Sequence, residues 1–345
     1  MSLQKTQTHF ELRNPIMTNT EQSSRLNHIL LQKNLVYLLH RPVYAKKTIK
    51  KIEKTILAQN LTRDEIAWLK SIDVRRWSID HERPYRTIEG ALFHCPVTAL
   101  VFSSLFHKLK QKYIKESNTL SFLTNYFKSD EFLHCIRDGQ HIVDTLLLWL
   151  NKKVEALNLP KAFSKDRSIF LQLSSLELKL IKARRLELIL SPPSTKPPAQ
   201  IQADQRLFLP KSIMLFQGSL GLSEAFILLN QEAIKLSNQQ GRSALLLAKI
   251  NLQKLPIDLS HSCTIMIQKN LPNSELSLLE QSSSKAQNCS IESLPDHLAQ
   301  VLKFVQAQPT YQELESLMFG YELNQDESLE LVQEWLENNL ISLKS

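Results

Sequence analysis

The sequence predicts a mainly α-helical protein with a smaller α+β part, and three observations support this fold class. Only 6 glycines occur in 345 residues, which is few for a sheet-rich enzyme with tight phosphate-binding loops. Apolar residues recur at helical spacing through the first 190 residues. After four prolines in residues 191–198, the pattern changes to short runs rich in Leu and Ile. We therefore expect an N-terminal helical domain and a C-terminal winged-helix-like module with a short antiparallel sheet.

The N-terminal half divides into a tail and a helical domain. Residues 1–22 are rich in Thr, Gln and Asn without apolar periodicity, which predicts a flexible tail. Residues 23–190 predict an all-α domain, in which Thr62 and Glu65 have the spacing of a capping box. A helix expected over 46–58 carries five lysines on one face. We interpret this face as solvated, with an acidic partner or RNA as the alternative.

Residues 191–200 predict a semi-rigid linker, because closely spaced prolines form neither helix nor sheet. An α+β domain is expected over 201–345. Its expected elements are strands at 206–209, 243–250, 264–269, 275–280 and 289–294 and helices over 222–236, 295–306, 310–319 and 326–338. The best-supported hairpin joins 275–280 to 289–294 through a turn at 282–288. Strands followed by three short helices are typical of a winged-helix-like module.

The net charge of +8 is unevenly distributed along the chain. Residues 1–60 hold ten Lys or Arg against three Asp or Glu, whereas residues 291–345 hold two against ten. Phosphate repulsion therefore makes nucleic-acid binding by the C-terminal module unlikely. No apolar run approaches the ~20 residues that cross a bilayer, and no secretory signal is visible. Four scattered cysteines without a CxxC pair fit a reduced, cytoplasmic location.

No recognised motif for catalysis, a metal or a cofactor occurs in the chain. The ten histidines show no HExxH pattern, and we interpret His134 and His141, seven residues apart, as ordinary histidines and not as metal ligands. Cys95 is expected to pack in the core. The sequence contains no nucleophile elbow, although it leaves open a Ser-His-Asp triad assembled from distant positions. We therefore expect no catalytic residue, no bound metal and no cofactor.

A polar group follows Trp77 in the chain. Arg83, Arg86 and Glu89 have the spacing of one helix face, and Asp80 precedes them. These residues could clamp an anion or form an internal ion-pair network that orients the loop after Trp77. We favour the network, because a loop with few glycines needs polar contacts to hold its conformation.

A longer pattern resembles a known family. Its residues are Trp77, Arg83, Arg86-Thr87, Pro96-Val97-Thr98, the segments 123–127 and 129–134, Leu176-Glu177 and Ala183-Arg184-Arg185. Over about 110 residues this pattern is similar to the helical partner proteins encoded beside multinuclear non-haem iron oxygenases of ribosomal peptide natural-product (RiPP) pathways. The chain departs from that pattern in its long basic N-terminal segment.

The resemblance implies an accessory subunit that is not itself an enzyme. It would bind an iron-dependent oxygenase, a barrel with two or three irons, and help to recognise the precursor peptide. The C-terminal module is similar to a peptide-recognition element in which a leader segment adds a strand to a sheet edge beside the third helix. The expected peptide-binding residues are Leu276, Leu278, Ile291, Leu329, Val332 and Trp335. For the last three a core position is the alternative, and for Trp335 it is the favoured one.

The expected docking or framework residues are Trp77, Arg83, Arg86 and Pro96. Two other functions compete with that of an accessory subunit. The first is a winged-helix regulator that binds DNA through its C-terminal helices, which the acidic charge there disfavours. The second is an enzyme in its own right, which no motif supports.

Overall fold

The computed structural model of the chain describes residues 19–110, 113–186, 201–269 and 289–343. Packing divides the chain into two compact units. Unit 1 combines the residues up to Pro84 with Phe127–His141, and unit 2 combines Tyr85–Tyr126 with the residues from Ile142 onward. The mainly α-helical fold with a small α+β part is confirmed. The predicted linker, 191–200, lies outside the described residues, so the domain boundary proposed there stays a prediction.

Unit 1 is built from short helices around a buried aromatic group. Its elements are α1 (Asn19–Leu39), α2 (Pro42–Thr48), the 3-10 helices η1 (Ile49–Lys54), η2 (Ile56–Ala58) and η3 (Val74–Ser78), α3 (Arg63–Ser71) and α7 (Asp130–Asp138). Tyr37 stacks on Phe132 and His40 stacks on Phe127, with ring centroids 5.6 and 4.9 Å apart. α1 begins at Asn19, inside the predicted tail. The capping box of Thr62 and Glu65 at the start of α3 is confirmed.

The prediction of one continuous helix over 46–58 is wrong. α2 ends at Thr48, and two 3-10 helices follow. The φ and ψ angles of Lys51 and Thr55 lie outside the helical region, so the segment does not form one continuous helix. The Thr55 hydroxyl donates to the Ile52 carbonyl (2.6 Å), a local bond that competes with the helix. The five lysines of this segment are all exposed.

Unit 2 contains a buried helix, α5 (Pro96–Leu109), with other helices around it. These are α4 (Arg83–Leu92, which begins in unit 1), α6 (Thr119–Leu123), α8 (Ile142–Glu155), α9 (Ser164–Arg185) and α10 (Leu222–Gln240), with the 3-10 helices η4 (Thr124–Lys128), η5 (Lys161–Phe163), η6 (Arg242–Leu246) and η7 (Leu252–Lys254). The strand predicted at 243–250 is wrong, because residues 243–246 belong to η6 and residues 247–250 form no strand. The Ser103 hydroxyl of α5 donates to the Leu246 carbonyl (2.7 Å), and the Ile250 N–H donates to the Ser104 hydroxyl (2.9 Å). These bonds take main-chain groups that a strand would use in a ladder.

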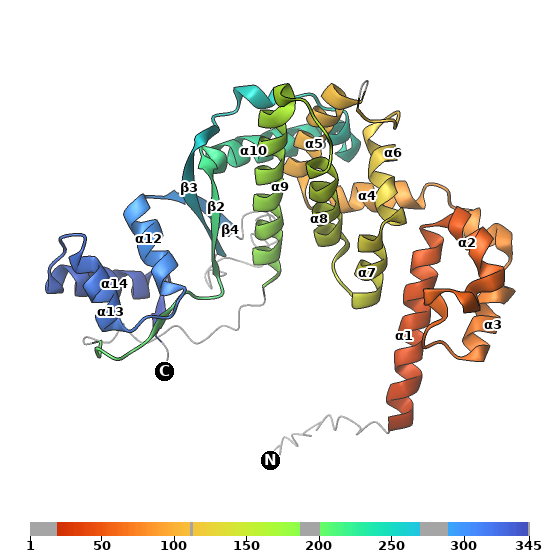
Figure 1. Ribbon diagram of the computed structural model, residues 1–345, viewed down its shortest axis with the longest axis horizontal. Helices are drawn as coiled ribbons and strands as arrows, with labels where there is room; N and C mark the ends of the chain where they lie inside the picture. The colour runs from red at the N-terminus through yellow and green to blue at the C-terminus, as the bar shows by residue number, and fades with distance from the viewer. Residues whose placement is uncertain (1–18, 111–112, 187–200, 270–288, 344–345) are drawn as a thin grey trace, which may run out of the picture. The chain divides into compact units, whose positions relative to one another are not determined.

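A three-stranded antiparallel sheet of unit 2 has the order β2-β3-β4. The strands are β2 (Ile213–Leu220), β3 (Asp258–Lys269) and β4 (Cys289–Leu294). α9 and α10 lie on one side of the sheet and α12 on the other (Figure 1). The strands predicted at 264–269 and 289–294 are confirmed. The strand predicted at 275–280 and its turn at 282–288 lie outside the described residues.

Three helices, α12 (Asp296–Val305), α13 (Tyr311–Phe319) and α14 (Gln325–Glu337), close the chain as predicted. Two short strands, β1 (Leu207–Phe208) and β5 (Ser342–Leu343), pair antiparallel, and Arg206 forms a bridge with Thr310. The three predicted helices are therefore present, together with a small antiparallel sheet whose strands, β1 and β5, are not those of the predicted hairpin. One core joins them to the larger sheet through Ile213, Met266 and Leu294. Capping boxes begin α13 at Thr310 and α14 at Asn324.

Within the described ranges, no single helix is long and apolar enough to cross a membrane. α4 and α5 meet the length and composition requirement only as a pair, and that pair is bent by 115°.

Candidate functional site

The hydrogen-bond pattern of the sheet shows which main-chain groups point toward a neighbouring strand. In an antiparallel pair, opposed residues alternate between those that exchange both main-chain hydrogen bonds and those that exchange none. The Lys269 N–H donates to the Ser212 carbonyl (2.8 Å), which fixes this alternation between β3 and β2. Every second residue of β3, counted back from Lys269, therefore bonds to β2. The residues between them, such as Gln268 and Met266, bond to β4.

The register of β3 and β4 extends this pattern to the edge of the sheet. Gln268 pairs with Ser290 and Met266 pairs with Glu292, so the main-chain groups of these two β4 residues face β3. Those of Cys289, Ile291 and Ser293 face away from the sheet. No hydrogen bond from the described part of the chain reaches the main-chain groups of these three residues. Among the described residues, no strand pairs with this outer edge of β4, and an edge of this kind can pair with an extended peptide.

The opposite edge of the sheet is occupied by side chains of α9. On β2 the same alternation turns the main-chain groups of Leu215 and Ser219 outward. The Lys179 ammonium donates to the Leu215 carbonyl (3.0 Å), and the Ser219 N–H donates to Gln172 Oε1 (2.8 Å). No sequence pattern identifies Gln172 and Lys179, because side-chain cover of an edge depends on tertiary packing. β2 itself was not predicted either, because its burial does not alternate along the strand.

A buried carboxylate holds α9 against α5. Glu177 Oε1 accepts from the Val97 N–H (3.0 Å) and Oε2 from the Thr98 N–H (2.7 Å), two groups in the first turn of α5. Burial raises the pKa of Glu177 to about 7, although hydrogen bonds from Thr98 and Val97 and the charge of Arg184 oppose the rise. Cys95, at the N-cap of α5, is fully buried as expected, and burial together with Glu177 raises the pKa of its thiol. The motif residues 96–98 and Glu177 thus form a helix-to-helix joint.

The structure does not bring the predicted peptide-binding residues into one surface patch. Ile291 lies opposite Ile267 on the sheet face toward α9 and α10, and its side chain is half-buried. Val332 and Trp335 are buried, at 0% and 6% exposure, in the core on the other face of the sheet. Leu329 packs against that core and is half-buried. Trp335 therefore occupies the core position that was favoured for it, and Val332 occupies the core position given as its alternative, because their side chains fill the α12–α14 core.

Leu276 and Leu278 lie outside the described residues, so their peptide-binding role stays a prediction. Ile291 lies on the outer edge of β4. Its main-chain N–H and C=O face away from the sheet.

The predicted framework residues occupy structural positions. Trp77, in η3, is buried at 2% exposure. Arg83 pairs with Asp80 at 3.4 Å, which agrees with the ion-pair network favoured from the sequence. Arg86 is exposed on α4, and Pro96 is the first residue of α5, where its missing N–H costs nothing. Their role in docking a partner stays a prediction.

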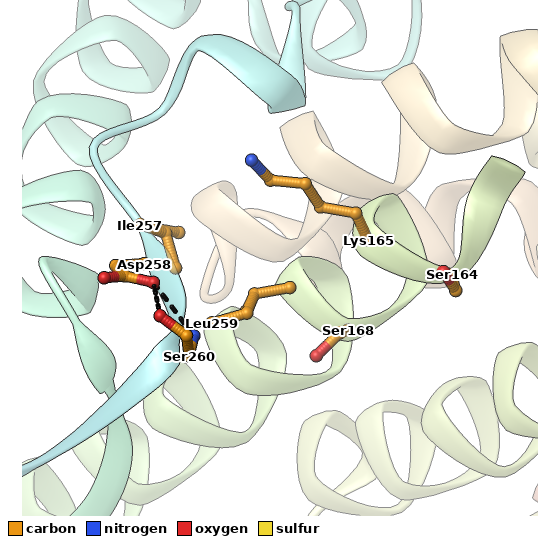
Figure 2. A pocket seen from close by; sticks show the side chains of 7 residues that line it. All are labelled: Ser164, Lys165, Ser168, Ile257, Asp258, Leu259 and Ser260. Atoms are coloured by element: carbon orange, nitrogen blue, oxygen red, sulfur yellow. Dashed lines mark hydrogen bonds between the residues drawn. The ribbon is translucent and has the colours of Figure 1, made fainter. Parts of the chain in front are cut away.

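An open pocket of about 490 Å³ lies between the start of α9 and the start of β3 (Figure 2). Asp258 contacts His261 Nδ1 (2.7 Å) and accepts from the Ser260 hydroxyl (2.5 Å). Figure 2 shows Asp258 and Ser260 on the wall opposite Lys165. Hydrogen bonds from Ser260 and His261 hold the pKa of Asp258 well below its usual range. The Ser260 hydroxyl lies 3.1 Å from the same Nδ1. A catalytic triad uses opposite ring nitrogens for its acid and its serine, so this group lacks triad geometry.

Among the described residues, no group of three or more His, Cys, Asp or Glu side chains is arranged to hold a metal ion. His134 lies 3.7 Å from Asp138 on the exposed surface of α7, and His141 follows that helix as an exposed residue.

No protein-family model matches this chain, and no curated protein matches it.

Proposed function

We propose that this chain is a non-catalytic accessory subunit that binds a multinuclear non-haem iron oxygenase and helps it to recognise a precursor peptide. The observation that carries the peptide part is the outer edge of β4, where the main-chain groups of Cys289, Ile291 and Ser293 face away from the sheet. An extended peptide can satisfy such groups by adding a fourth strand. The oxygenase as partner and the cytoplasmic location rest on the residue pattern and the composition of the chain.

The order of elements supports a recognition module. β2, β3 and β4 precede α12, α13 and α14, and one core joins the strands to the helices. A peptide on β4 would therefore extend a sheet whose inner strand and helices are fixed by packing. Recognition through a rigid edge reduces the entropy lost on binding, because only the peptide has to become ordered.

The charge of α14 disfavours the alternative of a DNA-binding regulator. This helix would occupy the place of a recognition helix, yet it contains no Lys or Arg. Its exposed acidic residues are Asp326, Glu327, Glu330, Glu334 and Glu337. Five carboxylates on one helix repel a phosphate backbone, so we favour a protein or peptide partner.

Affinity purification tests the proposal. The tagged chain is recovered from its native cells, and the complex is examined by mass spectrometry and by iron analysis. We expect an oxygenase with two or three irons per copy to co-purify at a fixed ratio. Recovery of the chain alone, or of iron held by the chain itself, would contradict the assignment of a non-catalytic subunit.

A peptide-binding experiment tests the role of the β4 edge separately. The change Ile291→Pro removes the outward N–H, whereas the matched control Ile291→Val keeps it. The ligand is the precursor peptide encoded beside the co-purified oxygenase. We expect it to bind the proline variant at least ~10-fold more weakly than the valine variant. The lost hydrogen bond and the steric clash of the proline ring with the peptide together cost over ~1.4 kcal/mol of binding free energy. Fluorescence anisotropy with a labelled peptide measures the difference. Equal affinities of the two variants would exclude strand addition at β4.

A further inference from the structure

The edge of β4 presents a row of three side chains toward α9 and α10. Cys289, Ile291 and Ser293 occupy alternate positions, so their side chains share one face of the sheet. They lie opposite Lys269, Ile267 and Ile265, respectively. An added strand would extend this face with every second side chain of its own. The surroundings of the three residues therefore determine which peptide side chains fit there.

The Cys289 end of this row is positively charged. Lys269, directly opposite Cys289, donates from Nζ to the carbonyls of Arg184 (3.0 Å) and Leu186 at the end of α9. Arg184 and Lys269 both act on the Cys289 thiol, where they oppose the increase of its pKa by burial. Within the described ranges, no carboxylate forms an ion pair with Arg184 or Lys269. The charges of Arg184 and Lys269 therefore favour an acidic peptide side chain at this end, although Lys269 also bonds to two carbonyls of α9.

The Ser293 end of the row is negatively charged. The hydroxyls of Ser293 and Ser223 lie 2.6 Å apart, and the Ser223 hydroxyl donates to Glu224 Oε2 (2.9 Å). Glu224 is exposed in the first turn of α10 and forms no ion pair with a cation of the described part of the chain. This carboxylate is therefore available to a basic side chain near Ser293.

We infer that the β4 edge selects an extended peptide with an acidic side chain at the Cys289 end, an apolar side chain opposite Ile291 and a basic side chain at the Ser293 end. This inference rests on the proposed peptide recognition and adds the chemistry and direction of the ligand. Cys289 and Ser293 are four residue steps apart along the strand, or about 13 Å, so the three side chains fall at alternate peptide positions. Antiparallel pairing, the slightly more stable arrangement, gives the order basic-x-apolar-x-acidic from N- to C-terminus.

Labelled synthetic peptides test the inference on the full-length chain. The probe carries Lys, Leu and Glu at alternate positions in a background of Ser, Thr and Val, and two further peptides replace its Glu or its Lys by Gln. We expect each replacement to weaken binding about threefold, the usual size of an exposed ion pair. In Arg184→Gln the loss caused by removing the peptide Glu should become smaller, because only Lys269 remains at that end. In Glu224→Gln the loss caused by removing the peptide Lys should disappear.

Lys182→Gln is the matched control, because it removes an exposed cation from the same helix at a position that the inference does not use. It should leave all three affinities in their wild-type ratio. Circular dichroism establishes that each variant is folded, and the two charge variants test opposite ends of the edge independently.

The outcomes separate the inference from the proposed function. Equal binding of the three peptides, with a loss in Ile291→Pro, would overturn the charge selection and leave peptide recognition at β4 in place. Binding that survives in Ile291→Pro, or no binding of any of the three to the wild-type chain, would overturn recognition at this edge together with the inference.

Discussion

The two edges of the β2-β3-β4 sheet are chemically alike but differ in what covers them. On β2, side chains of α9 bond to the outward main-chain groups of Leu215 and Ser219. On β4, no side chain or main chain of the described residues bonds to the corresponding groups of Ile291 and Ser293. The same helix contacts all three strands, yet its hydrogen-bonding side chains reach only the β2 edge.

This difference shows that a sheet edge can be closed without a further strand. A helix with polar side chains at suitable positions satisfies the edge and removes it as a pairing site. Closure of β2 also leaves a partner strand the β4 edge as the place to add, among the described strands of this sheet. Substitutions in the helix that covers β2, and then in the two edges, test this contrast.

The largest effect is expected from the joint that holds α9 in place. The folded-state pKa of Glu177 is about 7, compared with the ordinary 4.5. Between these values the folded state binds more protons than the unfolded state, so the free energy of unfolding falls as the pH rises from 4.5 to 7 and levels off above it. The contribution of this one group is roughly 3 kcal/mol. The variant Glu177→Gln should lose this slope, which urea unfolding at several pH values measures.

Glu155→Gln provides the control for that pH series, because Glu155 is an exposed carboxylate of α8. Its unfolding free energy should follow the wild-type pH profile. The same slope in Glu177→Gln as in the wild type would show that Glu177 does not retain its proton in the folded protein.

A pair of proline substitutions compares the two edges directly. Ser219→Pro removes an N–H that bonds to Gln172, whereas Ile291→Pro removes an N–H with no partner among the described residues. We expect Ser219→Pro to lower the free energy of unfolding by about 2 kcal/mol. Ile291→Pro should lower it by less than about 1 kcal/mol, because proline is tolerated at an open edge. Denaturant unfolding of the two variants gives the comparison, and equal losses would mean that the β4 edge is also covered.

The smallest effect is expected from removing part of the cover. Gln172→Ala leaves the Ser219 N–H without its acceptor, so unfolding should become easier by about 1 kcal/mol. Gln172→Glu is the control, because a carboxylate at this position still accepts from the N–H. Thermal unfolding compares the variants. If the alanine variant is as stable as the wild type, the bond from Ser219 to Gln172 does not close the β2 edge.

The sequence alone determined the elements that depend on local chemistry. The capping box at Thr62 and the three C-terminal helices follow from residue types a few positions apart, and the structure has them where they were predicted. The strand over 289–294 was also predictable from its composition. Local signals act over a turn or a strand, so they are readable without knowledge of the packing.

Only the tertiary structure decided which groups of the sheet are covered. β2 has buried and exposed residues on both faces, so its burial lacks the alternation that identifies a strand. The segment 243–250 has strand-like residues, but hydroxyls of α5 bind its main chain and it forms no strand. Val332 and Trp335 have the helical spacing of a groove and also that of a core, and only packing distinguishes the two. Glu177, Gln172 and Lys179 bond to residues 36–80 positions away, a separation over which no sequence pattern reports a contact.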